Sequence, residues 1–547
     1  MEMLFAPPDE EKRYRDCGMW GDLTLVERVL KHAAGSPDKL AMIDAKKQYT
    51  YGQLARIIDN LATNFLQMGV ARGQVVACQV PNWAELPIVH LAMNRIGALC
   101  MPIHDSWREM ETSHLLKQSG AVAAIVPLNY GGFDFPAMIA GMRGELPNLG
   151  KIFSIGGAGA HSSAFEPLLE DVPIDTAALD ARRPHPNDPG ALMLSSGTTS
   201  LPKVSIWSSN NYYAAVRAFA LAVEFVPEDV AAALAPTGTG AIGYGYPILT
   251  PLLHGGTTVI LEKWDPAAGV ELIRKHRCTY GTAVPAQLTQ MLPILETLKP
   301  ADFDGFRAFN NAGAPLPYDV GRQIEERMNC KVLGLYGATD GGTVSSPKMS
   351  DPQEKRLRTV GQPFEAREVK LVDADGNPVG PGEPGEIYWR TPDKSYGYLN
   401  DPEATSAAFT PDRFYKSGDL GRFDEDGYLM IIGRVKDMIL RGGRNISPRL
   451  IEEAMIEHPA ILEVAVAPMP DRVFGERACA FVILRKGAKL TFEDVIAFLK
   501  ERKVSVWQLP ERLEIMDDFP RSAGGKIAKN KLTEFVTLKL KGGTDPG

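Results

Sequence analysis

The segment 194–203 contains residue types suited to binding phosphate. It reads LSSGTTSLPK and follows an apolar stretch, 191–194, that is typical of a β-strand. Backbone N–H groups and hydroxyls can surround phosphate oxygens, and the ammonium of Lys203 adds positive charge. A P-loop fits poorly, because Pro202 precedes the lysine and residues 204–206 favour a strand where a P-loop would open a helix. A solvated turn rich in serine and threonine remains the alternative.

A second glycine-rich segment points to different chemistry. Residues 238–243 read GTGAIG and follow the strand-like stretch 230–234, so they match the GxGxxG pattern of dinucleotide-binding turns. Pro247 and Pro251 are expected to interrupt the helix that such a turn requires. An NAD-dependent oxidoreductase using Gly238–Gly243 is therefore kept as the alternative from another functional class.

Both segments lie in a region where predicted strands and helices alternate. Residues 51–70 have the apolar spacing of an amphipathic helix, with a β-rich run before and after the next helix. Such alternation predicts parallel sheets covered on both faces by helices. The predicted helices are 51–70, 84–96, 212–223, 268–277 and 320–328, and the predicted strands are 75–80, 121–126, 230–234, 257–261, 279–283 and 331–335.

The pattern changes in the last third of the chain. From about residue 360 it favours hairpins, with DADG at 373–376 as a turn between strands. The pattern of predicted strands and helices over residues 436–538 indicates a small α+β unit. We therefore expect an α/β protein with parallel αβαβα-type sheets in an N-terminal core, 1–435, which includes a β-rich subdomain at about 360–435. A small mobile α+β C-terminal domain, 436–547, follows.

Composition excludes several classes of protein. The formal net charge is −8 with both signs mixed, so no basic stripe indicates a nucleic-acid partner. No apolar run has the length of a membrane span, and the charged N-terminus does not resemble a signal peptide. The six separated cysteines lack metal-ligand spacing and indicate reduced thiols in the cytoplasm. We expect a cytoplasmic protein without a membrane partner, and homo-oligomer formation stays open.

Seven segments together resemble the adenylate-forming superfamily, which includes acyl-CoA synthetases, peptide-synthetase adenylation domains and firefly-type luciferases. The resemblance extends from about residue 20 to 535. This chain departs from the family pattern at Ser200, where glycine is usual, and at Val204 and Ser205, where a glycine normally follows the lysine. The segments are LSSGTTSLPK (194–203), NAGAPL (311–316), YGATD (336–340), YKSGDL (415–420), GRVKD (433–437), RGGRNISP (441–448) and PRSAGGKI (520–527).

The resemblance implies one ATP site. Thr339 would touch the α-phosphate, and Asp340, one methylene shorter than the family's usual glutamate, would hold Mg²⁺. Asp419 would bind the ribose, since one carboxylate can accept hydrogen bonds from two vicinal hydroxyls. The implied ATP- and AMP-binding residues are Ser195, Ser196, Gly197, Thr198, Thr199, Lys203, Gly313, Ala314, Pro315, Tyr336, Gly337, Thr339, Asp340, Asp419, Arg434 and Lys526.

The same resemblance assigns roles in the C-terminal part of the chain. Lys436 would be the hinge, and Gly442 and Gly443 would let the backbone approach a pantetheine arm closely. Lys526 would bridge the acyl carboxylate and the α-phosphate, where negative charge gathers in the transition state. The implied catalytic residues are Lys526, Thr339 and Lys203.

Within this superfamily, the sequence as a whole is most similar to aromatic-acid CoA ligases and dihydroxybenzoate-type aryl-acid activators. Where catecholate activators have an asparagine, this chain has Gly240, which cannot bind an ortho hydroxyl, and Thr239 replaces the usual histidine. The glycines that follow leave room for a ring. The implied acyl pocket is Thr239, Gly240, Ala241, Tyr213 and Gly313.

The expected activity is that of an AMP-forming carboxylate–CoA ligase. It would convert a ring-bearing acid with ATP to acyl-AMP and pyrophosphate, and then form the acyl-CoA thioester. ATP, Mg²⁺ and coenzyme A are the implied cofactors and substrates. Two alternatives stay open beside the oxidoreductase: a stand-alone adenylase that loads a carrier protein, and a nucleotide-binding regulator without catalysis.

Overall fold

The computed structural model describes residues 3–195, 201–442, 444–521, 527–540 and 542. Its N-terminal part contains two seven-stranded sheets that are parallel apart from one edge pair in each. The first sheet consists, in spatial order, of β7 (Ser163–Ala164), β6 (Lys151–Ile155), β5 (Ala123–Pro127), β3 (Val75–Gln79), β4 (Leu99–Ile103), β8 (Pro189–Ser195) and β9 (Lys203–Ser208). The second consists of β14 (Lys331–Gly334), β13 (Ala308–Asn311), β12 (Tyr280–Ala283), β10 (Val230–Ala233), β11 (Thr257–Ile260), β1 (Leu40–Ile43) and β2 (Gln48–Thr50).

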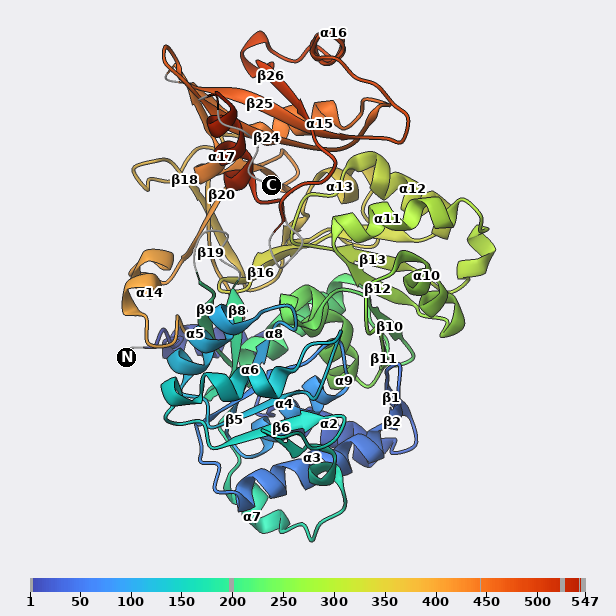
Figure 1. Cartoon of the computed structure of the whole chain (residues 1–547), viewed down its shortest axis with the longest axis vertical. Coiled ribbons are helices and arrows are strands. Elements are labelled where there is room, and N and C mark those ends of the chain that lie inside the picture. Colours follow the sequence, from blue (N-terminus) through green and yellow to red (C-terminus); the bar gives the residue numbers. More distant parts are fainter. Residues whose placement is uncertain (1–2, 196–200, 443, 522–526, 541, 543–547) are drawn as a thin grey trace.

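Helices form three layers around these two sheets (Figure 1). One layer packs between the sheets, and each outer face is covered by a layer of its own, which gives the predicted αβαβα order. The inner layer contains α2 (Leu25–Gly35), α3 (Tyr51–Gln67), α4 (Glu85–Arg95), α8 (Ser209–Ala222) and α9 (Thr250–His254). The outer layers contain α5 (Glu109–Ser119) and α6 (Phe135–Gly141) on the first sheet, and α10 (Pro266–Lys275), α11 (Pro285–Leu295) and α12 (Tyr318–Met328) on the second.

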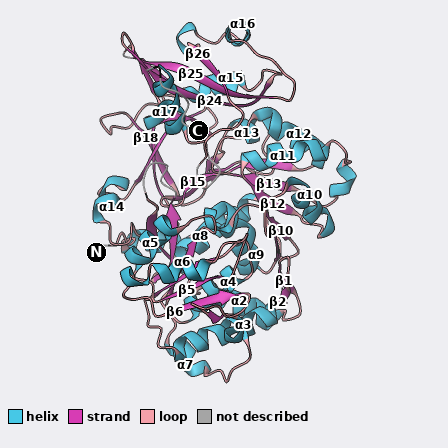
Figure 2. Ribbon diagram, viewed as in Figure 1, coloured by secondary structure: helices cyan, strands magenta, loops and turns pink. Residues whose placement is uncertain are grey.

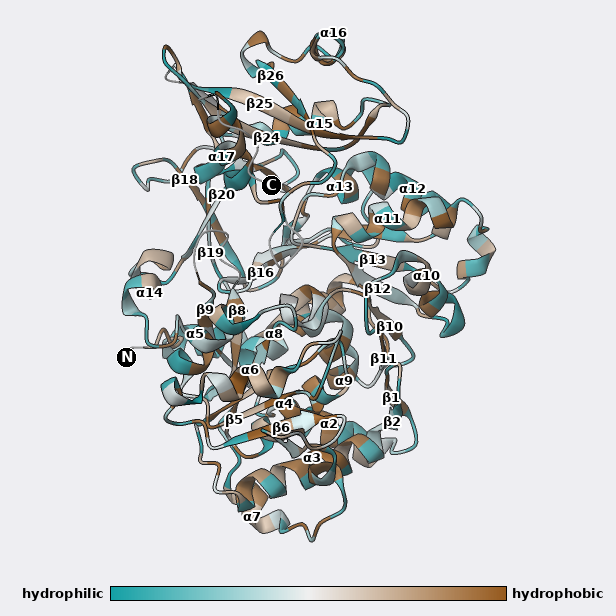
Figure 3. Cartoon of the chain, in the orientation of Figure 1, coloured by the Kyte–Doolittle hydropathy of each residue, from teal (hydrophilic) through white to brown (hydrophobic). Residues whose placement is uncertain are grey.

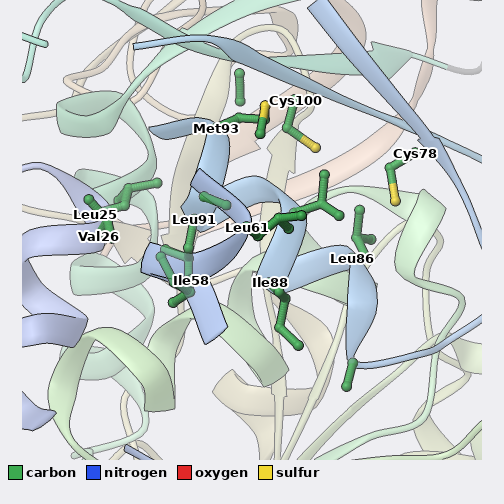
Figure 4. Packing of buried hydrophobic residues seen from close by; sticks show 14 of the residues in the cluster. Leu25, Val26, Ile58, Leu61, Cys78, Leu86, Ile88, Leu91, Met93 and Cys100 are labelled. Atoms are coloured by element: carbon green, nitrogen blue, oxygen red, sulfur yellow. The ribbon is translucent and has the colours of Figure 1, made fainter. Parts of the chain in front are cut away.

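The inner helices differ in how far they are buried: α2 and α3 keep a polar face toward solvent, whereas α4 lies between the two sheets. Every residue of α4 is buried, and side chains such as Ile88 and Leu91 contact the same cluster as Cys78 and Cys100 of the first sheet (Figure 4). The hydropathy colouring shows the same contrast between brown interior and teal periphery (Figure 3). All six cysteines are free thiols and five are buried, as the sequence predicts.

The chain beyond residue 335 is richer in strands (Figure 2). A three-stranded sheet contains β15 (Tyr336–Ala338), β16 (Gly342–Ser346) and β17 (Gln362–Pro363), and an antiparallel four-stranded sheet contains β18 (Glu368–Val372), β19 (Gly385–Arg390), β20 (Tyr415–Phe423) and β21 (Leu429–Arg434). The remaining helices of this half and of the N-terminal half are α1 (Pro8–Asp16), α7 (Thr176–Ala181), α13 (Gln353–Arg358) and α14 (Pro402–Ala408).

A separate small α+β unit follows, drawn in red in Figure 1. Its sheet contains β22 (Ile439–Arg441), β23 (Arg444–Ile446), β24 (Ile461–Asp471), β25 (Gly475–Leu484) and β26 (Arg512–Ile515), and its helices are α15 (Pro448–Met455), α16 (Phe492–Glu501) and α17 (Lys529–Leu540). Two hydrophobic clusters on its sheet form its own core. The predicted fold class is confirmed, including the small C-terminal domain. The boundary at 435/436 stays a prediction.

One local feature differs from the sequence prediction. Residues Ala241–Leu249 form a π-helix that continues into α9, although Pro247 and Pro251 lie inside this stretch. Pro247 has no N–H group and would break a regular α-helix. The wider hydrogen-bond pattern of a π-helix, in which the bonds span five residues, accommodates it. Within the described ranges, no helix is long and apolar enough to cross a membrane.

Candidate active site

Strands β8 and β9 bring the two ends of the predicted phosphate loop together. They pair antiparallel with Ser195 opposite Lys203. Residues Ser196, Gly197, Thr198 and Thr199 lie outside the described residues. The antiparallel direction was not predicted, and it fixes Lys203 at the mouth of that loop.

Asp419 lies at the centre of a polar group formed by three strands. It pairs with Arg434 across β20 and β21, and Arg434 Nε lies 2.9 Å from Asp419 Oδ1. The Tyr336 hydroxyl donates to Asp419 Oδ2 at 2.8 Å, and the backbone N–H of Asp419 donates to Ser417 Oγ at 2.9 Å. The Asp419 side chain keeps 21% exposure. Each carboxylate oxygen can accept more than one hydrogen bond, so the group can still receive a ligand from solvent.

Asp340, four residues after Tyr336, lies in a second polar group with Lys203. The Tyr398 hydroxyl donates to Asp340 Oδ2 at 2.8 Å, and Lys203 Nζ lies 4.9 Å from the centre of the Tyr398 ring. Asp340 Oδ1 is buried and has no hydrogen-bond partner among the described residues. Burial raises the pKa of Asp340 to about 6, while the Tyr398 hydrogen bond and the Lys203 charge act in the opposite direction. The segment 336–340 therefore connects the Asp419 group with the Lys203 group.

The position of Asp340 is fixed by alternate residues of the segment 389–395, which extends from β19. After β19 ends at Arg390, the chain turns at residues 392–393, where the Lys394 N–H donates to the Thr391 carbonyl at 3.4 Å. Trp389 Nε1 and Thr391 Oγ1 donate to the Gly341 carbonyl at 2.7 and 2.9 Å, Asp393 Oδ2 accepts from the Thr343 N–H at 2.7 Å, and the Ser395 N–H donates to the Asp340 carbonyl at 3.0 Å.

Two glycines allow this close approach. A Cβ at Gly341 would lie 2.4 Å from Tyr415 Cδ1, so no larger residue fits without a shift. Gly342 has a φ of +85°, which disfavours a side chain. A fully buried ion pair supports the same turn: Arg367 donates to Asp393 at 3.1 Å and to the Thr343 carbonyl at 3.1 Å.

Gly240 lies against the same segment from the other side. Its φ is +70°, and a Cβ there would lie 3.0 Å from Met193 Cε and 3.6 Å from Thr339 Oγ1. The predicted acyl pocket and the predicted α-phosphate contact are thus neighbours, and Ala241 follows as the first residue of the π-helix. The side chain of Thr239 is not among those that the structure describes. Gly313, Ala314 and Pro315 form an exposed turn after β13.

Tyr213 does not join this group, contrary to the sequence prediction. The Arg28 guanidinium carbon lies 3.3 Å from the centre of the Tyr213 ring, which also stacks on His254 at 5.7 Å. The preceding Tyr212 packs instead against His90 and Trp207. Successive residues of an α-helix are about 100° apart around its axis, so neighbouring tyrosines on α8 point to different faces.

Two of the predicted C-terminal residues lie in a short 3₁₀ turn after β21 and in a hairpin. Lys436 is exposed in a 3₁₀ turn, Val435–Asp437, between the β21 strand and the small domain. Gly442, with a φ of +56°, lies in the two-residue turn between β22 and β23, and its N–H donates to the Phe474 carbonyl at 2.8 Å. Gly443 and Lys526 are not among the described residues, although Arg521 and Ile527 form an antiparallel bridge on either side of 522–526.

Sequence reasoning missed Tyr398 and the 389–395 segment. The available signal was the alternation of polar residues, Thr391, Asp393 and Ser395, directly after a predicted strand. Nothing in the local sequence says that the segment after β19 contacts the turn at 340–343, about 50 residues earlier.

The dinucleotide alternative finds no support. A dinucleotide-binding turn leads from a strand into an α-helix that holds the pyrophosphate. Here Gly240 turns against Met193 and Thr339, and a π-helix follows.

Comparisons with known proteins agree with this arrangement. The model of the AMP-binding enzyme family matches residues 29–399, and that of the AMP-binding enzyme C-terminal domain matches residues 450–526. The chain is 32% identical over 536 residues to a medium-chain fatty-acid–CoA ligase of Escherichia coli (strain K12), covering 97% of this chain and 94% of that protein.

A second relative is the 2,3-dihydroxybenzoate-AMP ligase of Bacillus subtilis (strain 168), which is 30% identical over 547 residues and covers 98% of this chain and 99% of its own. The fold matches the crystal structure of an anthranilate CoA ligase in complex with anthranoyl-AMP, with a TM-score of 0.86, 23% identity, and coverage of 96% of this chain and 99% of that one. The chain therefore belongs to the AMP-binding enzyme family and is an adenylate-forming acid–thiol ligase.

Proposed function

We propose that this protein activates a ring-bearing carboxylic acid as its acyl-AMP and transfers the acyl group to coenzyme A. The observation that carries the proposal is the segment 336–340. Tyr336 at one end contacts Asp419, and Asp340 at the other lies beside Lys203 and Tyr398. One nucleotide lying along this segment would place its ribose near Asp419 and its phosphates near Lys203.

At the ribose end, Asp419 accepts hydrogen bonds from the two vicinal hydroxyls while Arg434 and Tyr336 hold the carboxylate in place. The arrangement is suited to this because the carboxylate is oriented by partners on both oxygens and remains reachable from solvent. At the phosphate end, Lys203 and the loop residues Ser195, Ser196, Gly197, Thr198 and Thr199 surround the β- and γ-phosphates. Thr339 contacts the α-phosphate beside Gly240.

Mg²⁺ fits the chemistry of Asp340. Oδ1 of this buried carboxylate is a hard oxygen donor without a hydrogen-bond partner. No group of three or more histidine, cysteine, aspartate or glutamate side chains in the described part of the chain could form a complete metal site. Asp340 and nucleotide oxygens would therefore hold the ion together, as is usual for Mg²⁺, and when bound it would neutralise phosphate charge.

In the first step, a carboxylate oxygen of the acid attacks the α-phosphorus, and the bond to the β-phosphate oxygen breaks to release pyrophosphate. Lys526 lies in the tail segment that would close over the site, and its ammonium stabilises the charge on both reactants. In the second step, the small domain pivots at Lys436 and presents the turn of Gly442 and Gly443. The thiol sulfur attacks the acyl carbon, the thiol proton passes to solvent and AMP leaves.

The preference for a ring rests on Gly240. This residue adjoins Thr339, where the reacting carboxylate must lie, and it carries no side chain. The π-helix that begins after it buries Gly243 and Gly245 as well. The flexible end of Met193 lies against Gly240, at 3.0 Å from its Cβ position, and we expect its movement to admit a flat ring directly attached to the carboxyl group.

Pyrophosphate release with a panel of acids tests the proposal. The panel contains benzoate, anthranilate, 2,3-dihydroxybenzoate, an alicyclic acid and octanoate, each with and without coenzyme A. We expect release with a ring acid and stimulation by coenzyme A, with an acyl-CoA product seen by mass spectrometry. Preference for octanoate would refute the ring assignment, and acyl-AMP accumulation without a CoA product would favour loading of a carrier protein.

The role of Lys526 is tested with the Lys526→Ala variant in ATP–pyrophosphate exchange. Loss of at least 100-fold is expected, on the order of the loss when one transition-state donor is removed. The nearby Lys529 pairs with Glu452 and serves as the matched control, since Lys529→Ala should leave exchange nearly unchanged. Equal exchange by the wild type and Lys526→Ala would refute the assigned role.

A further inference from the structure

Two arginines in the N-terminal domain lie close together without an acidic partner. Arg28 on α2 and Arg217 on α8 make no ion pair or hydrogen bond to a carboxylate in the described part of the chain. The Nε atoms of both are buried without a hydrogen-bond partner. Both side chains are half-buried, so their outer nitrogens can still be reached from solvent.

The surroundings hold both guanidinium groups against one loop. A Cβ at Gly18 would lie 3.3 Å from Arg217 Nη2, and a Cβ at Gly21 would lie 3.1 Å from Arg28 Nη2. Gly18 has a φ of +70°, so the loop turns its bare backbone toward the arginines. Helices α2, α8 and α9, which carry these residues and His254, pack against one another.

The positive charge of Arg28 is offset only in part, by the Tyr213 ring under its guanidinium and by the charge of Glu27. Burial lowers the pKa of Arg28, and the neighbouring charge of Arg217 lowers it further. The nearest acid is Glu27, which is already engaged by Arg183 and by the N-cap Thr24. His254, whose ring stacks on Tyr213 beside Arg28, has its pKa lowered by burial to about 4 and is neutral at physiological pH.

Buried charges in proteins are ordinarily paired, because an unpaired one loses hydration without compensation. Two adjacent arginines without a carboxylate match the geometry in which guanidinium forks bind the oxygens of a carboxylate or phosphate group. We propose that Arg28 and Arg217, against the Gly18–Gly21 loop, form a binding site for a small oxyanion.

This site is distinct from the active site. His254 ends the helical stretch that starts next to Gly240, and the 14 residues 241–254 extend on the order of 15–20 Å. The contacts of Arg28 and Tyr213 are with α8, α9 and the 18–21 loop. The inference therefore does not depend on the assigned acid or acceptor.

Thermal unfolding in low-salt buffer, with inorganic phosphate, acetate or chloride at matched ionic strength, tests the site. Phosphate at 10 mM should raise the wild-type melting temperature by about 2 °C more than chloride, because a ligand that binds only the folded state stabilises it. A rise with acetate as well would identify carboxylates as ligands, and a rise with phosphate alone would restrict the site to phosphate groups.

Arg28→Gln and Arg217→Gln should each abolish this rise. Without phosphate they should melt at or above the wild-type temperature, because one of two repelling charges has been removed. Lys203→Met is the control for phosphate bound at the nucleotide site and should keep the rise. If both arginine variants retain the phosphate effect, or Lys203→Met alone removes it, the proposal is wrong. Calorimetric titration of phosphate into the same proteins gives the second measurement.

Discussion

Tyr336 and Asp340 lie at opposite ends of a five-residue segment, and each anchors a different half of the site. Tyr336 donates to Asp419 and Asp340 accepts from Tyr398, both at 2.8 Å. In the proposed assignment, the ribose and phosphate contacts are therefore linked through the backbone of the segment 336–340, which contains Thr339. Changes at the two ends should have separable effects on catalysis.

Tyr336→Phe should weaken ATP binding without removing the chemistry. The variant loses the hydrogen bond that orients Asp419, a loss on the order of 1 kcal/mol. We expect the KM for ATP to rise about fivefold in ATP–pyrophosphate exchange, with kcat little changed. Asp419→Asn should have a larger effect in the same direction, because it also removes the ion pair with Arg434. An unchanged KM for ATP in both variants would contradict the ribose assignment.

Gly341→Ala should destabilise the protein and disturb the Asp340 turn. The added methyl group would lie 2.4 Å from the Tyr415 ring and 2.8 Å from Trp389 Nε1, and both rings are held by packing. Overpacking of this kind costs about 1–3 kcal/mol. Gly141→Ala is the matched control, since nothing lies within 4 Å of its Cβ position. Thermal unfolding should show a lower melting temperature for the first variant only.

The Arg367–Asp393 pair should be essential for folding of the turn. Both side chains have 0% exposure, and Asp393 also accepts from the Thr343 N–H. Removing one partner leaves a buried charge unpaired, which costs about 3–5 kcal/mol. Arg367→Met should therefore lower the midpoint of urea unfolding strongly, whereas Lys12→Met, which breaks the exposed pair with Asp16, should change it little. Equal midpoints for the two variants would refute this.

The sequence predicted most of the fold, but not the residues that hold the 340–343 turn of the site in place. Strands and helices came from apolar periodicity, and Lys203, Asp340, Asp419 and Arg434 were identified from motifs and do converge. Tyr398 and the alternate residues of 389–395 were not, because their contacts with the 340–343 turn arise only when the β-rich region packs on the parallel sheets. Tyr213 was misplaced because a helix position without its partners does not tell which face is inward.

Lys394 should make stability depend on pH. Its amine is buried, donates to the Leu4 carbonyl at 2.9 Å and lies near Arg413, and burial with that charge lowers its pKa from 10.5 to about 7. The unfolded lysine stays protonated up to about pH 10, so between pH 7 and pH 10 the unfolded chain binds more protons than the folded one. Stability should therefore rise with pH in this window, by at most about 1.4 kcal/mol per unit.

The matched variant is Lys394→Met, which keeps the length of the side chain and removes the titrating group. Urea unfolding midpoints of both proteins, measured at pH 7, 8 and 9, should converge as the pH rises, because neutralising Lys394 removes the cost of a buried charge. At pH 7 the variant gains stability by removing the buried charge and loses the hydrogen bond to the Leu4 carbonyl. The loss of this bond does not depend on pH, so the two proteins should differ in the slope of stability against pH whatever its size. Parallel pH profiles for the two proteins would show that Lys394 keeps its proton in the folded state and that burial does not control its titration.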